Sequence, residues 1–235
     1  IDPADVARAL TARTRMVVVC SPSNPTGAVD RREDLDRLAV LLAERGIAWL
    51  SDEIYAGFAY DGPAPSISAF SPAGGIVISG LSKDLSMTGW RIGWAVGERA
   101  LVSRIIAAHQ YLVTCAPSVS QAAALAALSP DAEPERAAYL ETFRRRRALM
   151  AEELSRIPGL RFDLPDGAFY FFVDASRFGS ALPICRRVLE RRKVVTIPGA
   201  AFGETCDGWI RISYAAPEEK IVRGIRAFGE ELLSS

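Results

Sequence analysis

This chain is poor in several chemical resources, and each shortage excludes a class of function. Its four cysteines, Cys20, Cys115, Cys185 and Cys206, form no Cys-x-x-Cys pair, so neither a zinc site nor a disulfide framework is indicated. The 28 basic residues are balanced by 28 acidic ones, so no charge excess predicts binding to nucleic acid. No apolar run approaches the length of a membrane span. We therefore expect no metal, nucleic-acid or membrane partner, and a cytoplasmic location that suits free cysteines.

Common catalytic motifs are also missing. The single histidine, His109, lies in an apolar stretch typical of a helix, which argues against a Ser-His-Asp triad. A Ser-x-x-Lys nucleophile is excluded because the position three residues before Lys83 is Gly80. The chain contains neither Gly-x-Gly-x-x-Gly nor a Walker A sequence. Hydrolase, nucleotide-binding and dinucleotide-binding chemistry of these kinds is therefore not predicted.

The first positive signal is a set of apolar runs that each end in polar residues. Three of them have the length and branching of buried parallel strands: Met16–Cys20, Gly46–Leu50 and Gly75–Leu81. Asn24, Asp52 and Lys83 follow these runs in order. Because open α/β sheets bind their ligands where parallel strands end, we expect these three side chains to converge on one crevice.

A fourth polar group is placed by spacing alone. Only seven residues separate Lys83 from the next strand-like run, Arg91–Val96. A parallel crossover needs a dozen or more residues, so this strand should run antiparallel. Arg91 would then begin at the edge where the other strands finish, which adds a guanidinium to the same crevice.

These motifs together resemble a known family, the fold type I pyridoxal-phosphate enzymes of aminotransferase class I/II. The resemblance is carried, in order and spacing, by Asn24-Pro25-Thr26-Gly27, Asp52 with Tyr55, Ser82-Lys83, Gly89-Trp90-Arg91, Gly203 and Arg211-Ile-Ser213. It covers essentially all of the chain. It implies an α/β fold in which part of a mainly parallel large-domain sheet, with one antiparallel strand, is followed by a small α+β C-terminal domain.

The resemblance also implies a cofactor, pyridoxal 5′-phosphate, and roles for the residues that would hold it. Lys83 would carry the cofactor as a Schiff base and then move the proton at the substrate Cα. Asp52 would keep the ring nitrogen protonated. Tyr55 and Asn24 would donate to the phenolate oxygen. Arg91 would contact the phosphate with its guanidinium fork.

Two further roles concern the phosphate and the substrate. Many family members carry a phosphate-binding serine where this chain has Gly80, and Ser79 or Ser82 is expected to substitute. Arg211 is similar to the family's anchor for the substrate α-carboxylate, with Asn24 nearby. Strand alternation puts Arg211 on the face opposite Ile210 and Ile212. The alternative role of Arg211 is a salt bridge within the small domain.

The implied reaction moves an amino group between an L-amino acid and a 2-oxo acid by a ping-pong mechanism, and the implied assembly of the full-length protein is a homodimer. Two other functions stay open: a pyridoxal-phosphate lyase of the same fold, and the aminotransferase-like sensor domain of a transcription regulator. The chain starts at Ile1, which matches a point partway through the family's large domain. We therefore also consider that this form is an inactive fragment.

Pro-rich and helical patterns suggest how the chain is divided. Residues 1–128 are expected to belong to the large cofactor-binding domain and residues 129–235 to the small domain. A helix is predicted over Arg31–Arg45 from its apolar spacing, and another over Pro183–Arg192. Trp90 and Trp94 are expected to be packing residues.

Overall fold

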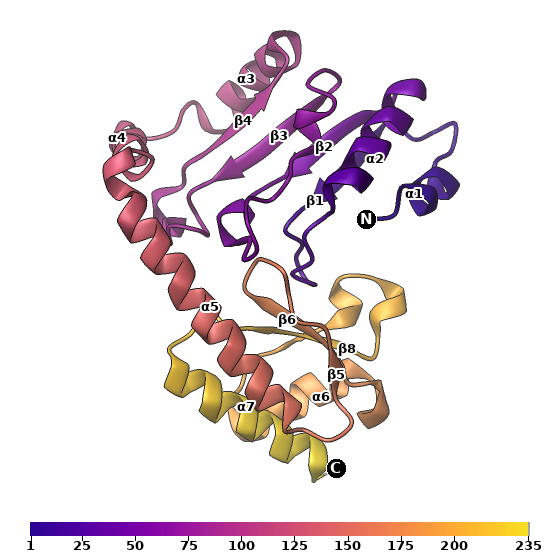
Figure 1. Ribbon diagram of the computed structural model, residues 1–235, viewed down its shortest axis with the longest axis vertical. Helices are drawn as coiled ribbons and strands as arrows, with labels where there is room; N and C mark the ends of the chain where they lie inside the picture. The colour runs from indigo at the N-terminus through magenta and orange to yellow at the C-terminus, as the bar shows by residue number, and fades with distance from the viewer. Residues whose placement is uncertain (235) are drawn as a thin grey trace. The chain divides into compact units, whose positions relative to one another are not determined.

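The chain folds into two compact units. The computed structural model describes residues 1–234, and Figure 1 traces them from indigo at the N-terminus to yellow at the C-terminus. The first unit comprises Ile1–Pro22 and Val29–Tyr139, and the second comprises Ser23–Ala28 and the chain from Leu140 onward. The short segment Ser23–Ala28 thus belongs with residues much later in the sequence.

A four-stranded sheet forms the centre of the first unit. Its strands lie in the order in which they occur in the chain: β1 (Met16–Cys20), β2 (Ala48–Asp52), β3 (Gly75–Gly80) and β4 (Gly93–Gly97). β1, β2 and β3 are parallel, and β4 pairs with β3 in the antiparallel direction. The prediction of one antiparallel strand is therefore confirmed, for the reason that the connection is too short for a crossover.

Helix α2 provides most of the apolar cover in the first unit. It spans Arg32–Glu44, and its Leu35, Leu38 and Leu42 are buried, as the predicted helical spacing requires. They share one hydrophobic cluster with Val19 of β1 and other sheet residues. The remaining helices of this unit are α1 (Pro3–Ala9), α3 (Arg99–Val113) and α4 (Ser118–Ala127), with short 3₁₀ turns at Ala56–Phe58, Ile67–Ala69, Thr88–Trp90 and Pro130–Ala132.

Helices α3 and α4 contribute little to this core. No residue of α3 is buried, and Ser120 is the buried residue of α4. Trp90 and Trp94, which were expected to pack, are 43% and 38% exposed. Each tryptophan is therefore partly covered, and neither belongs to the buried core of the first unit.

A smaller antiparallel sheet organises the second unit. Its strands are β5 (Arg161–Phe162), β6 (Tyr170–Asp174), β7 (Ile197–Pro198) and β8 (Trp209–Ser213), in the order β5-β6-β8-β7. The long helix α5 (Glu133–Ser155) enters this unit at Leu140, and α7 (Glu218–Leu233) closes the chain. Helices beside an antiparallel sheet give the α+β arrangement that was predicted.

One face of the small sheet forms the core of this unit. Phe171 and Val173 of β6 are 0% exposed, and Ile210 and Ile212 of β8 are 0% and 4% exposed. The amphipathic helix α7 adds Ile221 and other apolar residues to the core. The opposite face of β6 and β8 therefore carries the alternate residues.

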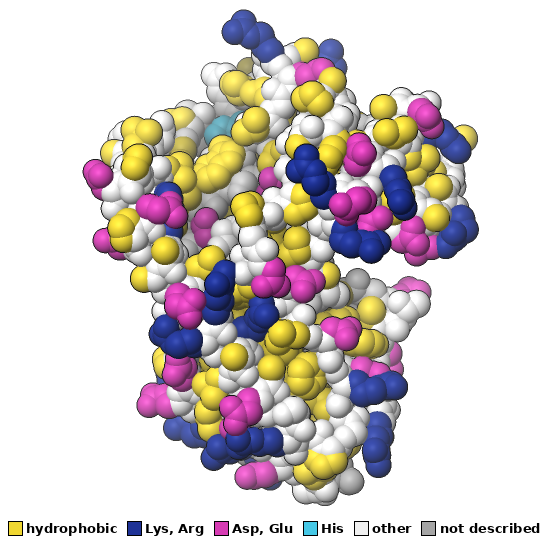
Figure 2. Space-filling model, in the orientation of Figure 1, with side chains coloured by type: hydrophobic (Ala, Val, Ile, Leu, Met, Phe, Trp, Pro, Cys, Tyr) yellow, Lys and Arg dark blue, Asp and Glu magenta, His cyan; other side chains and the backbone are white. Residues whose placement is uncertain are grey.

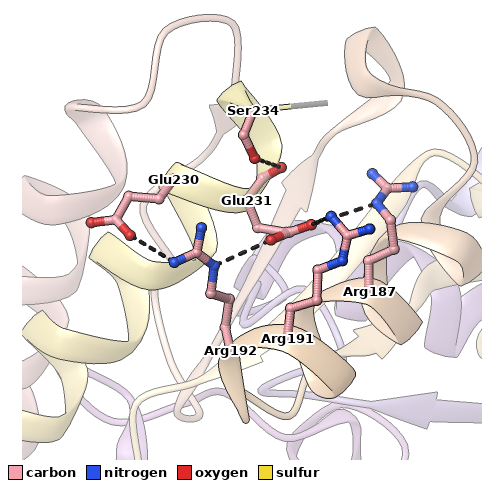
Figure 3. A network of polar contacts seen from close by, with 6 residues as sticks. All are labelled: Arg187, Arg191, Arg192, Glu230, Glu231 and Ser234. Atoms are coloured by element: carbon pink, nitrogen blue, oxygen red, sulfur yellow. Dashed lines mark hydrogen bonds and ion pairs between the residues drawn. The ribbon is translucent and has the colours of Figure 1, made fainter.

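The end of α7 is held by a buried acid among arginines. Glu231 is 2% exposed, and Figure 3 shows it facing three guanidinium groups. Arg191 Nη1 lies 3.1 Å from Glu231 Oε1, and Arg192 Nε lies 3.2 Å from Oε2. Arg187 Nε is 3.8 Å from Oε1. These ion pairs join α7 to the segment that precedes β7.

That segment differs from the regular helix predicted over Pro183–Arg192. The α-helix α6 covers Ala181–Arg187, and a π-helical turn follows at Val188–Arg192. It ends at Lys193, whose φ of 58° is left-handed. Arg187 at the end of α6 and Arg191 and Arg192 of the π turn all contact the same carboxylate, a long-range interaction that helical periodicity does not encode.

None of the helices within residues 1–234 combines the length and the hydropathy that crossing a lipid bilayer requires.

Candidate active site

The first unit brings several predicted residues to one edge of its sheet. Asp52 is the last residue of β2, and Lys83 follows β3 by three residues. Because β2 and β3 are parallel and in register from Trp49 opposite Gly75 onward, both side chains belong to the carboxyl edge of the sheet. This is the edge at which open α/β sheets bind ligands.

Asp52 keeps part of its hydrogen-bonding capacity for a ligand. Its Oδ1 accepts a hydrogen bond from Ile54 N at 3.1 Å, which fixes the orientation of the carboxylate. The neighbouring Glu53 is already engaged, since its Oε1 accepts hydrogen bonds from Ser51 Oγ at 2.9 Å and from Ser66 Oγ at 2.5 Å. Of the two adjacent acids, Asp52 is therefore the one whose carboxylate can meet a cationic group.

Lys83 lies close to Tyr55. Its Nζ is 6.0 Å from the centroid of the Tyr55 ring, near the outer limit for a cation–π contact. Tyr55 is only 5% exposed, which fixes the ring. Within residues 1–234 no acidic side chain forms an ion pair with Lys83. The amine is therefore left without an ion-pair partner among these residues.

The two serines near Lys83, Ser79 and Ser82, differ in whether their hydroxyl groups are already hydrogen-bonded. Ser79 Oγ donates to Glu53 O at 3.1 Å, so its proton is already used. Ser82 makes no such bond among the described residues, which leaves Ser82 as the better substitute for the family's serine. A Cβ atom at Gly80 would come within 2.8 Å of Ile92 O and 2.9 Å of Gly93 Cα. The close approach of β4 therefore explains why position 80 is glycine here.

Arg91 lies just before β4. Its backbone is left-handed, with φ at 51°, and its Nη1 donates to Thr88 O at 3.0 Å. Since Gly93 pairs with Gly80 at the end of β3, Arg91 reaches the same edge of the sheet as Lys83. No acidic residue in the described part of the chain forms an ion pair with Arg91, so its charge is available to an anion.

The second unit brings Asn24 and Arg211 together. Arg211 Nη1 donates to Asn24 Oδ1 at 2.7 Å. Because this bond uses the amide oxygen, the amide NH₂ of Asn24 remains as a donor for another acceptor. The Asn24–Pro25 peptide bond is cis. Convergence of Asn24 with Asp52 and Lys83 stays a prediction.

The turn that carries Asn24 is built around Gly27. Ser23 N donates to Ala28 O at 2.9 Å and Gly27 N donates to Ser23 O at 2.8 Å. Gly27 has φ at +71°, and a Cβ there would meet Pro165 Cβ at 2.4 Å. Only glycine satisfies both conditions. The Asn-Pro-Thr-Gly motif is thus a turn, as its residue types favour, and it packs closely on Pro165 within the second unit.

Arg211 does not form the salt bridge that was its alternative role. No ion pair joins it to an acidic residue within residues 1–234, and alternation places it opposite the buried Ile210 and Ile212 as predicted. Two aromatic rings flank its guanidinium instead. Arg211 Cζ is 4.4 Å from the Tyr170 ring centroid and 5.0 Å from that of Phe202.

Sequence reasoning did not identify these rings as partners of Arg211. The available signal was the alternation of β6, which puts Tyr170 and Phe172 on the same face as Arg211. Nothing in the sequence pointed to Phe202.

Asp84, directly after Lys83, was also not predicted. Its Oδ1 is buried without a hydrogen-bond partner. Burial raises the pKa of this carboxyl above the ordinary aspartate value, while the backbone amides of Leu85 and Asp84 and the charge of Arg136 act in the opposite direction. A Cβ at Gly57 would lie 2.6 Å from Asp84 Cβ, so the glycine makes room for the carboxylate.

The residues present fit a phosphorylated pyridine aldehyde better than a metal. Within residues 1–234 no three His, Cys, Asp or Glu side chains are grouped so that they could hold a metal ion. The first unit instead offers an amine, a carboxylate, a hydroxyl and an unpaired guanidinium: Lys83, Asp52, Ser82 and Arg91. The amine suits an aldehyde, the carboxylate suits a protonated ring nitrogen, and the hydroxyl and the guanidinium both suit a phosphate.

Comparison with known proteins identifies the family. A mainly parallel α/β sheet with a lysine and a carboxylate at its carboxyl edge is typical of α/β proteins that bind a ligand at that edge. Residues 1–228 match aminotransferase class I and II. The chain belongs to this family, whose cofactor is pyridoxal 5′-phosphate.

Curated relatives are similar in sequence to nearly the whole of this chain. The aspartate/prephenate aminotransferase of Thermus thermophilus is 37% identical over 235 residues, which is 98% of this chain and 60% of that protein. The aspartate aminotransferase of Geobacillus stearothermophilus is 37% identical over 226 residues, 92% of this chain and 56% of that protein. The chain thus spans less than two thirds of the length of these relatives.

Solved structures agree with this assignment. The aromatic aminotransferase from Pyrococcus horikoshii OT3 gives a TM-score of 0.94 at 30% identity, covering 100% of this chain and 64% of that one. Aspartate aminotransferase from Thermus thermophilus with maleate gives 0.92 at 35% identity, covering 98% and 60%. The fold is therefore that of the fold type I pyridoxal-phosphate-dependent aminotransferases, as predicted.

Proposed function

We propose that this chain forms part of an aminotransferase that moves an amino group between an L-amino acid and a 2-oxo acid with pyridoxal 5′-phosphate. The observation that carries the proposal is the unpaired Lys83 beside Tyr55 at the sheet edge where Asp52 ends β2. The names of the relatives support the same reaction type.

The residues of the first unit would hold the cofactor and move the proton. When bound, the cofactor supplies an electron sink that makes the Cα–H bond of an amino acid acidic. Lys83 Nζ would hold the cofactor at its aldehyde carbon and, once that bond is released, would accept the proton from Cα as a general base. Asp52 keeps the ring nitrogen protonated, because a carboxylate beside that nitrogen favours its charged form. Arg91 and Ser82 bind the phosphate, and Tyr55 donates to the phenolate oxygen.

The residues of the second unit would orient the substrate. Arg211 has no acidic partner among residues 1–234 and presents a planar fork that matches a carboxylate. Asn24 holds one of its N–H donors and keeps its own NH₂ for the phenolate oxygen. Fixing the α-carboxylate determines which Cα bond aligns with the cofactor ring, and alignment selects the bond that breaks.

The wider context belongs to the same proposal. Residues 1–128 would serve as the cofactor-binding domain and residues 129–235 as the small domain. The full-length protein would be a cytoplasmic homodimer. The four free cysteines support a reducing location. Light scattering of the full-length protein tests the dimer.

Removing the amine of Lys83 is the sharpest test. Lys83→Ala should abolish the visible absorbance of the lysine-bound cofactor and lower turnover of the loaded full-length enzyme by at least about 10³-fold. Lys220→Ala, which removes an exposed lysine from the first turn of α7, is the matched control and should leave both unchanged. Retention of the visible band in Lys83→Ala would refute the role of this lysine.

The kinetics of the full-length enzyme test the reaction type. We expect ping-pong behaviour in which amino acid and 2-oxo acid react in separate half-reactions. Release of ammonia without any acceptor would indicate a lyase instead. Ligand binding without turnover would indicate a sensor domain.

A further inference from the structure

The surroundings of Arg211 are aromatic and not acidic. On β6 and β8, Tyr170 and Phe172 share one face of the sheet with Trp209 and Arg211, because side chains alternate along each strand. Phe172 is the direct cross-strand neighbour of Arg211. The 3₁₀ turn Gly199–Ala201 leads from β7 to the fourth ring, that of Phe202.

Two of these rings contact the guanidinium itself. Arg211 Cζ lies 4.4 Å from the Tyr170 centroid and 5.0 Å from the Phe202 centroid. Both distances are well inside the range of cation–π attraction, about 6 Å. A ring accepts no conventional hydrogen bond from an in-plane N–H, so these contacts leave the donors of the fork unused.

The rings are themselves held in place. Phe202 meets Phe172 edge to face at 6.0 Å, and Phe172 stacks on Trp209 at 5.1 Å. Tyr170 is 7% exposed and lies 4.6 Å from Phe169. Each ring beside Arg211 is therefore supported by a second ring.

A glycine allows the turn before Phe202 to come this close to β8. A Cβ atom at Gly199 would lie 2.1 Å from Cys206 O and 2.7 Å from Trp209 O. Any larger residue would push the turn outward, and Phe202 with it. Gly199 is therefore part of the support of this ring.

We propose that Tyr170 and Phe202 are positioning residues that set the plane of the Arg211 guanidinium for a carboxylate ligand. The two rings and Asn24 Oδ1 fix the group at three points. The N–H donors that remain lie in the plane of the guanidinium, where a carboxylate can accept two of them in parallel. The proposal rests on the proposed function, in which Arg211 binds the α-carboxylate of the substrate.

The two rings also affect hydration. They cover the guanidinium where an exposed arginine would contact water, so less solvent has to be displaced when a carboxylate binds. Loss of either ring should both free the side chain to change rotamer and increase its hydration. We expect binding of a carboxylate to weaken about tenfold for each ring removed.

The test uses the 235-residue chain labelled with ¹⁵N and propionate as the carboxylate probe. Arg211→Lys identifies the Nε–Hε resonance of Arg211 by its disappearance. In the wild-type chain this proton should be shifted upfield by the ring currents of Tyr170 and Phe202. Tyr170→Leu should move it back toward the position of an exposed arginine, and Tyr170→Phe should not.

Propionate titration then measures the effect on binding. We expect the dissociation constant to rise about tenfold in Tyr170→Leu and in Phe202→Leu, and to be unchanged in Tyr170→Phe. The matched control is Phe162→Leu, which removes a ring of the same unit that packs on Phe171 at 5.4 Å. Circular dichroism confirms that each variant is folded.

The outcomes separate this inference from the proposed function. Absence of an upfield shift in the wild-type chain overturns the positioning role. Loss of the shift in Tyr170→Leu with an unchanged dissociation constant overturns it as well. If the shift is present but propionate leaves the Arg211 resonance unaffected, the carboxylate role of Arg211 fails, and the positioning role fails with it.

Discussion

The two units differ in how completely they bury their own helices. In the second unit, α7 places six residues in the core, among them Phe228 and Leu232. In the first unit, α3 is about as long and buries none. Tyr111 and Leu112 at the end of α3 are 91% and 80% exposed, and Figure 2 shows hydrophobic side chains on the visible surface around α3 and α4.

This contrast shows where each unit obtains its stability. Burial of apolar area contributes about 25 cal/mol per Å², so α7 contributes to the second unit while α3 adds little to the first. The first unit depends on α2 and its sheet. The second unit also buries acids that are paired with arginines, among them Glu153 and Glu231, which are 4% and 2% exposed.

Glu153 in the second unit and Asp84 in the first have pKa values that are shifted in opposite directions. In the second unit, the hydrogen bond from Arg226 lowers the pKa of Glu153, followed by the opposing effect of burial and the attraction of Arg156. In the first unit, burial raises the pKa of Asp84. The fold therefore favours the charged form of one acid and the neutral form of the other.

The largest effect is expected at Glu231. Glu231→Gln should lower the free energy of unfolding of the second unit by about 2–3 kcal/mol, because a neutral amide leaves three guanidinium groups without their shared anion. Hydrogen exchange of the α7 amides in increasing urea measures this unit alone. Glu230→Gln is the matched control: its carboxylate is 64% exposed and pairs with Arg192 at 3.0 Å, so its loss should cost less than about 0.5 kcal/mol. Equal costs for the two variants would contradict the role of Glu231.

A smaller and pH-dependent effect is expected at Glu153. Its folded-state pKa is depressed, so its contribution is present above the unfolded pKa and is lost as pH falls through the folded pKa. Because Arg226 is 60% exposed, solvent screens the pair, and Glu153→Gln should cost about 1–2 kcal/mol near neutral pH. The same α7 amides report the cost, which should shrink as pH is lowered. A cost that does not change with pH would show that charge is not the cause.

The opposite pH dependence is expected at Asp84. Its folded-state pKa is raised, so its contribution is present below the unfolded pKa and is lost as pH rises through the folded pKa. Asp84→Asn should therefore stabilise the first unit by about 1 kcal/mol near neutral pH and make no difference at about pH 4. Hydrogen exchange of the β3 amides measures it. Asp61→Asn, at an exposed acid, is the control and should be neutral.

The smallest effect on stability is expected at the exposed end of α3. Leu112→Lys should change the free energy of unfolding by less than about 0.5 kcal/mol, because Leu112 buries little in this chain. It should also reduce binding of a hydrophobic dye. Leu38→Lys, at a residue that is 0% exposed, should by contrast unfold the first unit. A large loss of stability in Leu112→Lys would mean that α3 is better packed than its exposure indicates.

Local pattern predicted much of the fold. The apolar runs predicted three strands, and the seven-residue connection predicted the direction of β4. Strand position and connection length can both be predicted because each depends on residues that are close in sequence. The second strand begins at Ala48 and not at the predicted Gly46, whose φ of +61° makes it a turn residue. The boundary is therefore set by a glycine whose conformation the sequence does not specify.

The candidate site was less accessible to such reasoning. Motif spacing predicted Lys83 and Asp52, of which Asp52 ends β2 and Lys83 follows β3 by three residues. The two rings beside Arg211 come from β6 and from a turn after β7, and the room for Asp84 comes from Gly57 on another loop. These contacts depend on tertiary packing, which one-dimensional patterns do not contain.

The placement of Ser23–Ala28 in the second unit has a practical consequence for dividing this molecule. An expression fragment that starts at Leu140 would include Arg211 but not Asn24, its hydrogen-bond acceptor 187 positions earlier. It would also lack Gly27, which packs closely on Pro165. Such a fragment would need the missing turn supplied in trans as a peptide. The second unit is therefore discontinuous in sequence even though it is compact in space.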